Sequence, residues 1–307
     1  MSYPSFARAT EVVDHFVNLL AEHGIDLTRG SAAEGEALAM FDVFEMWKNP
    51  ARRPADPRPI AKAAMGFVDL AGKVMGVKDH PDFGQLVPHL QMLSKTTVLQ
   101  NAVSLVTDDA ANKVIELYMA CLAMTFGSSI ALDHPVNSKG DNPDVMLDFR
   151  GHRWALALKT LHSRKPRTIY DNIKKAADQI EASPATHGLV VLNVKNLLDY
   201  DALWPSPTVS YPEQLAVEHL EAQVTSVISG LQEIPREDWL HALAPSRKCA
   251  PPVVFIGHAG FSAFPEFGDQ PHFMPIKAIC VYLEPQDDPK GGMKLVRELH
   301  HASQQFI

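Results

Sequence analysis

The first hundred residues carry apolar side chains at the spacing of an α-helix. Val12, Phe16 and Leu19 share one helical face in a segment that stops at Gly24. The segment AAEGEALAMFDVFEMWKN repeats the pattern and ends before NPARRPADPRP, whose four prolines cannot continue a helix. Two more helical segments follow, IAKAAMGFVDLAGKVMG and FGQLVPHLQMLSKT, and no stretch alternates like a strand. The pattern predicts an all-helical N-terminal domain over residues 1–103.

From residue 104 onward the pattern changes to helices mixed with short apolar strands. The expected helices cover residues 109–126, 168–182, 212–231 and 293–306. The expected strands cover residues 129–133, 143–149, 153–160, 187–194, 251–258 and 275–284. This order predicts an α/β domain over residues 104–307, in which helices flank a sheet.

The hairpin NPDVMLDFRGHRWALALKT, residues 142–160, carries the first chemical signal. Side chains alternate between the two faces of a strand, and the bulky apolar residues of both hairpin strands occupy one face. The opposite face then holds Asp144, Ala157 and Lys159. An acid, small residues and a lysine do not make a second hydrophobic core. We therefore expect this face to be the floor of a functional site.

Two neighbouring helices offer further polar candidates. Glu116 is the only acid between residues 111 and 132, in an otherwise apolar helix, and a buried carboxylate needs a cation or a metal beside it. Gln179 flanks the apolar stripe of the helix after the hairpin and could face Lys159. Each could equally be an ordinary surface residue when it is considered alone.

Composition narrows the class of protein. The chain has 307 residues, of which 46% are hydrophobic and 21% charged, which is typical of a globular protein with a proper core. Its longest apolar stretch, residues 117–126, is about half the length of a membrane-spanning helix, so we expect no membrane association. The N-terminus lacks the pattern of a signal peptide, and the three cysteines are scattered. These features predict a reducing, intracellular location, most simply the cytoplasm.

Charge is distributed unevenly along the chain. The net charge of −8 does not indicate a nucleic-acid-binding protein. Between His162 and Lys175, however, five basic residues accompany a single acid, Asp171. This segment could be a solvated helix face or a surface for phosphate groups.

Together these motifs resemble the PD-(D/E)xK nuclease superfamily over about residues 109–194. The matching features are a helix with Glu116, the Pro143-Asp144 pair, the third-strand Ala157-Leu158-Lys159, and Gln179, where RecB-like members often have a functional glutamine. The resemblance implies a restriction-endonuclease-like mixed sheet flanked by helices. It also implies a Mg²⁺- or Mn²⁺-dependent DNA endonuclease of restriction, repair or defence, and a homodimer by analogy with restriction enzymes.

The resemblance also implies roles for individual residues. Asp144 and Glu116 would be metal ligands, helped by the Leu158 carbonyl, and Lys159 would be the catalytic lysine. The basic side chains expected to hold the DNA backbone are those of Arg164, Lys165, Arg167 and Lys175.

Ala157 departs from the family pattern, because the family has Asp or Glu there as the second essential metal ligand. The chain could be an engineered variant of a parent reading ALELKT or ALDLKT, or a naturally decayed nuclease kept for binding nucleic acid or a protein partner. The acid could also come from elsewhere, but Asp148 lies about 13 Å along the strand and Asp171 should face solvent, which leaves Glu116. We expect this chain to be inactivated at Ala157, and the intact remainder of the site favours the first explanation. The match could also be a coincidence in an unrelated α/β protein.

Overall fold

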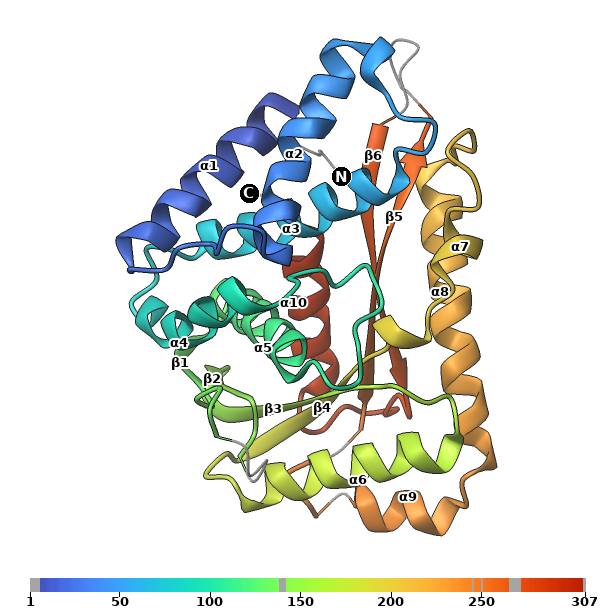
Figure 1. Ribbon diagram of the computed structural model, residues 1–307. Coiled ribbons are helices and arrows are strands. Elements are labelled where there is room, and N and C mark those ends of the chain that lie inside the picture. The colour runs from blue at the N-terminus through green and yellow to red at the C-terminus, as the bar shows by residue number, and fades with distance from the viewer. Residues whose placement is uncertain (1–5, 138–141, 245, 250, 265–271, 306–307) are drawn as a thin grey trace.

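The computed structural model describes residues 6–137, 142–244, 246–249, 251–264 and 272–305 (Figure 1). Before residue 104 its regular elements are all helical: α1 (Phe6–Glu22), α2 (Ala32–Lys48), α3 (Arg58–Gly76), α4 (Val87–Leu90) and short 3₁₀ turns. The later helices are α5 (Asp109–Met124), α6 (Pro166–Ala182), α7 (Tyr200–Leu203), α8 (Glu213–Ser229), α9 (Arg236–Ala242) and α10 (Gly292–Gln304). The strands are β1 (Ser128–Leu132), β2 (Val145–Phe149), β3 (His152–Thr160), β4 (His187–Asn193), β5 (Val253–Ala263) and β6 (His272–Tyr282).

The strands form one mixed sheet in the order β1-β2-β3-β4-β5-β6. The outer pairs β1–β2, β2–β3 and β5–β6 are antiparallel, whereas β3–β4 and β4–β5 are parallel. Helix α6 makes the crossover that a parallel β3–β4 pair requires. In Figure 1, β3 and β4 run between α5 above and α6 below. The predicted α/β class, with helices flanking a sheet, is therefore confirmed.

Two hydrophobic cores lie on opposite faces of this sheet. The first contains the bulky face of the hairpin, including Leu147 and Leu156, together with α5 and α10. It also contains Phe16 of α1 and Phe67 of α3, so the N-terminal helices and the sheet share one core. The boundary predicted at residue 103 does not separate two cores.

The second core corrects one expectation from the sequence. Ala155 and Ala157 on the small face of β3 are fully buried, and they pack with Ile169 and Ile173 of α6. This face is a hydrophobic core along most of its length, because the alanine methyl groups let α6 lie close to the sheet. Its end on β3 is polar, at the half-buried Lys159.

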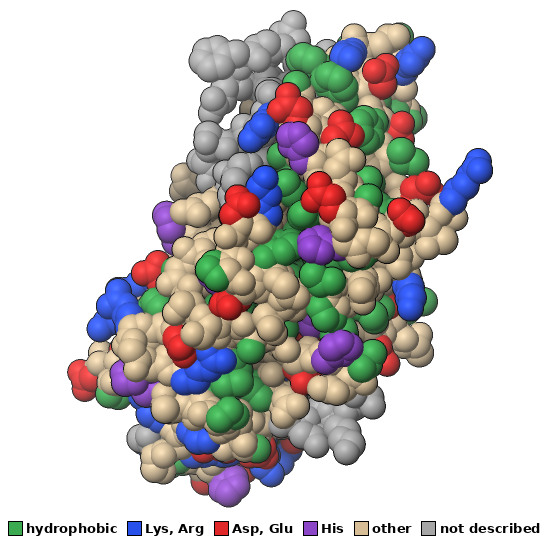
Figure 2. All heavy atoms as spheres, turned by 90° about the vertical axis from the view of Figure 1, so that its left-hand side faces the viewer, with side chains coloured by type: hydrophobic (Ala, Val, Ile, Leu, Met, Phe, Trp, Pro, Cys, Tyr) green, Lys and Arg blue, Asp and Glu red, His purple; other side chains and the backbone are tan. Residues whose placement is uncertain are grey.

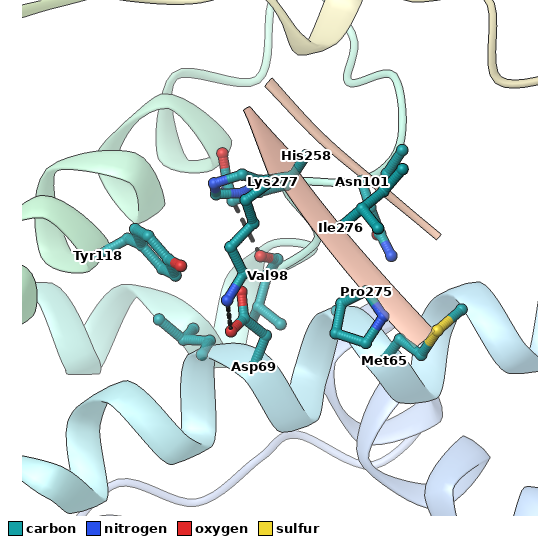
Figure 3. Close-up of a pocket in the computed structure, with 13 residues that line it drawn as sticks. Met65, Asp69, Val98, Asn101, Tyr118, His258, Pro275, Ile276 and Lys277 are labelled. Atoms are coloured by element: carbon teal, nitrogen blue, oxygen red, sulfur yellow. Dashed lines mark hydrogen bonds and ion pairs between the residues drawn. The ribbon is translucent and has the colours of Figure 1, made fainter. Parts of the chain in front are cut away.

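A small polar cluster joins the N-terminal helices to the end of the chain (Figure 3). Lys277 of β6 points at Asp69 of α3, with 2.5 Å between Nζ and Oδ1, and it also donates to the Ser303 carbonyl at 2.8 Å. Lys73 of α3 donates to the Ala302 carbonyl at 2.7 Å. The adjoining cavity of about 10 Å³ holds a single water at most, so this cluster is structural.

In the ranges that the structure describes, no helix combines the length and apolar character needed to cross a bilayer.

Candidate functional site

Asp144 is fixed against β3 at the point where β2 begins. Its backbone N–H donates to the Leu156 carbonyl at 3.0 Å, and its Oδ2 accepts from the Leu158 N–H at 2.6 Å. Asp144 lies just before the first register pair of the hairpin, Val145 with Leu156. The hairpin therefore holds the carboxylate rigidly next to the position where the family pattern has its second acid.

Glu116 reaches the same place from α5. Lys113, one helical turn earlier, places Nζ 2.8 Å from Oε1 and 3.0 Å from Oε2 of this carboxylate. His89 of α4 places Nε2 3.2 Å from Oε2. The Glu116 side chain is 7% exposed, so Lys113 and His89 take up both of its oxygens.

The two carboxyl groups influence each other. Burial and, after it, the nearby Glu116 charge raise the pKa of Asp144 to about 7, although the Lys159 ammonium acts in the opposite direction. Burial also raises the pKa of Glu116, against the lowering effect of Lys113. Burial lowers the pKa of His89 to about 4, so this imidazole is neutral at pH 7. Two acids, two lysines and a neutral histidine thus share one partly enclosed site.

Lys159 completes this group from the carboxyl end of β3. It lies two residues beyond Ala157, on the same strand face, and it is half-buried. Its charge acts on both Asp144 and Glu116. The structure therefore brings Asp144, Glu116 and Lys159 together from three separate elements. Ala157 adjoins them, with a side chain that is 0% exposed and offers no ligand atom.

Gln179 is not brought to the carboxylates. Its neighbour Ile180 packs against Gly188, near the start of β4. Lys159 pairs with Leu192, four residues further along β4 and about 13 Å away. Helix α6 runs back along the sheet, so its last turns lie at the far end of β3.

Two of the four predicted DNA-contacting residues line an open groove of about 1020 Å³ at the carboxyl ends of β3 and β4. They are Arg164, whose guanidinium donates to the Leu197 carbonyl, and the exposed Lys165. Arg167 instead forms an ion pair with Asp238 at 2.7 Å, and Lys175 is exposed on α6 away from the groove lining. The remaining lining residues are Val103, His162, Ser163, Asn196, Leu197, Leu198, Asp199, Tyr200 and Asp201.

One face of the molecule carries no continuous basic patch. The face on the left of Figure 1 is seen directly in Figure 2, where acidic, basic and apolar side chains are interspersed.

The residues present do not fit the divalent metal that the resemblance implies. Ala157 has no donor atom, and Glu116 is already paired with Lys113 and His89. Within the described ranges, no group of three or more His, Cys, Asp or Glu side chains is arranged to hold a metal ion. The Leu158 carbonyl oxygen would then be joined by a single carboxylate, that of Asp144.

His89 and Lys113 are the site residues that sequence reasoning missed. Lys113 was detectable, because it precedes Glu116 by three residues and such pairs meet on one helix face. His89 was not, because only the packing of α4 against α5 brings it to Glu116.

Comparison with known proteins supplies no identity. No family model, no curated protein and no solved structure matches the chain. A functional conclusion has to come from the residues themselves.

Proposed function

We propose that this chain is a DNA-binding protein of the PD-(D/E)xK nuclease lineage whose hydrolytic centre is inactive because of Ala157. The observation that carries the proposal is the meeting of Asp144, Glu116 and Lys159 beside Ala157. The order α5, β1 to β3, α6, β4, with α5 and α6 on opposite faces of the sheet, supports a restriction-endonuclease-like fold.

The missing acid accounts for the proposed loss of hydrolysis. Cleavage of a phosphodiester bond needs an activated water and stabilisation of the charge that develops on phosphate. A glutamate at position 157 would stand one residue before Leu158, whose N–H binds Asp144, and its side chain would have to displace the packing of α6 to offer a second carboxylate to Mg²⁺ or Mn²⁺. In this chain Lys159 keeps its charge at the site and can still neutralise a phosphate oxygen.

The groove supports DNA as the partner. Arg164 and Lys165 present positive charge beside the carboxyl end of β3, so the DNA backbone would pass next to Lys159. Asp199 and Asp201 line the same groove and offset part of this charge. We therefore expect modest affinity with little sequence preference, which falls as salt rises.

The decisive experiment restores the acid. The wild type, Ala157→Glu and the double variant A157E/K159M are incubated with labelled DNA and Mg²⁺ or Mn²⁺. We expect cleavage by Ala157→Glu alone, and a loss of about 100-fold or more when Lys159 is also replaced. Gel-shift titration of the wild type at several salt concentrations tests binding.

Two outcomes would contradict the proposal. If Ala157→Glu remains inactive and the wild type binds no DNA, neither the lineage nor the partner is right. If the wild type itself cleaves DNA, Ala157 does not inactivate the centre.

A protein partner is the second candidate. Val103, Leu105 and Val106, near the groove, are exposed by 62%, 76% and 68%. Side chains of this kind suit an apolar protein surface better than phosphate. Under this candidate, the double variant L105D/V106D leaves DNA affinity unchanged. If the segment of residues 103–106 contacts DNA, the same double variant lowers the affinity for DNA.

A further inference from the structure

We infer, on the basis of the proposed function, that the Lys113 ammonium occupies the cation position of this site, so that the chain binds its partner without a divalent metal. Lys113 would then be a built-in counter-charge that replaces a metal ion. This role goes beyond the missing acid at position 157, because it concerns the carboxylate of Glu116, which is present.

The contacts of Glu116 carry the first step. Lys113 Nζ lies 2.8 Å and 3.0 Å from the two carboxylate oxygens, so one ammonium bridges both. A metal ion that used Glu116 would have to displace this ammonium from a carboxylate that is 7% exposed. Breaking a buried ion pair leaves a charge without its partner, which is costly.

His89 holds the same carboxyl group from α4, with Nε2 3.2 Å from Oε2. When Glu116 is ionised, the neutral imidazole donates from Nε2 to this oxygen. That nitrogen is then unavailable as a metal ligand. The position that a histidine ligand would take is instead used to hold Glu116 in place.

The balance of charge gives the third step. Lys113 and Lys159 together balance Glu116 and Asp144 when both acids are ionised. The two ammonium groups already supply the positive charge that a divalent cation would bring to these carboxylates.

Direct metal titration tests this inference without DNA. Binding of Mn²⁺ is followed by electron paramagnetic resonance for the wild type, Lys113→Met and Lys294→Met. Lys294 is an exposed lysine on α10 and serves as the matched control. We expect Lys113→Met to bind one Mn²⁺ at least about tenfold more tightly than the wild type and Lys294→Met. The added substitution Glu116→Gln should abolish this gain.

Thermal unfolding keeps the test decisive if Lys113→Met is poorly folded. Mn²⁺ should then raise its unfolding temperature and leave that of Lys294→Met unchanged. Tight Mn²⁺ binding by the wild type overturns the inference, as does a folded Lys113→Met with no gain in affinity or no stabilisation by Mn²⁺.

The two proposals can fail separately. If the wild type binds no DNA but Lys113→Met gains Mn²⁺, the proposed partner is wrong and the role of Lys113 stands. If DNA binding by the wild type is lost on adding EDTA, a metal takes part and the role assigned to Lys113 is wrong.

Discussion

Asp144 is a buried carboxyl group whose pKa lies well above its ordinary range. A group with a raised folded-state pKa is protonated in the folded protein over a range where the unfolded chain has already lost its proton. Between the ordinary aspartate pKa of 3.8 and about 7, the folded state therefore binds more protons than the unfolded state. The contribution of Asp144 to stability is present below about pH 4 and is lost as pH rises toward 7.

This linkage predicts the effect of Asp144→Asn. The amide oxygen of the introduced side chain can still accept a hydrogen bond from the Leu158 N–H. The amide group does not ionise, so the variant should not lose stability as the pH rises. Relative to the wild type, its free energy of unfolding should rise between pH 4 and pH 8 by a few kcal/mol, about 4 at most. Urea unfolding at both pH values measures the difference, and Asp148→Asn on the solvent side of β2 is the control. Equal shifts in both variants would show that Asp144 ionises like a surface acid.

The hairpin shows what a sequence can and cannot predict about a single residue. The alternation of bulky and small side chains predicted that Ala157 and Lys159 share a face of β3, because strand geometry fixes that relation. For Asp144, which precedes β2, the shared face stays a prediction. The alternation could not predict that α6 covers Ala157, because an alanine fits an open floor and a tightly packed helix equally well. The pairing of Glu116 with His89 likewise depends on tertiary packing alone.

At the scale of elements, the contact between α6 and β4 sets where Gln179 lies. Periodicity predicted α6 almost to the residue, but it did not show that the last turns of α6 lie far from Lys159. That distance follows from the crossover between the parallel strands β3 and β4, which must return α6 along the sheet before β4 begins. The prediction placed Gln179 from its face of the helix alone and did not include the direction in which α6 runs relative to β3.

Close packing at Gly188 gives a test of this arrangement. A methyl group added at Gly188 would lie 2.2 Å from Cγ2 of Ile180, so Gly188→Ala should destabilise the protein by about 1–3 kcal/mol. Gly35, exposed on α2 with nothing within 4 Å of an added methyl group, is the matched control. Gly35→Ala should stabilise the protein by about 0.5–1 kcal/mol. Urea unfolding measures the free energy of unfolding of both variants. Similar changes in the two variants would mean that α6 does not pack closely against β4.

At the scale of the whole molecule, the N-terminal helices belong to the structure of the sheet. They share a core with the hairpin, and α4 supplies His89 to the site. We therefore expect the fragment of residues 104–307 to lose cooperative unfolding and to bind a dye specific for exposed apolar surface. Circular dichroism during thermal unfolding, with the full chain as control, checks this. A fragment that unfolds cooperatively with unchanged near-ultraviolet dichroism would establish the predicted boundary at residue 103.

The ties between α3 and the α10 region bear on how the chain folds during synthesis. Lys73 and Lys277 reach the carbonyl groups of Ala302 and Ser303, and Leu295 and Leu299 complete the core that α1 begins. A nascent chain cannot close this core until α10 has left the ribosome. Until then α1 and α3 expose apolar faces, to which chaperones or neighbouring nascent chains can bind. The apolar faces of α1 and α3 should therefore stay without their final partners for as long as α10 has not been synthesised.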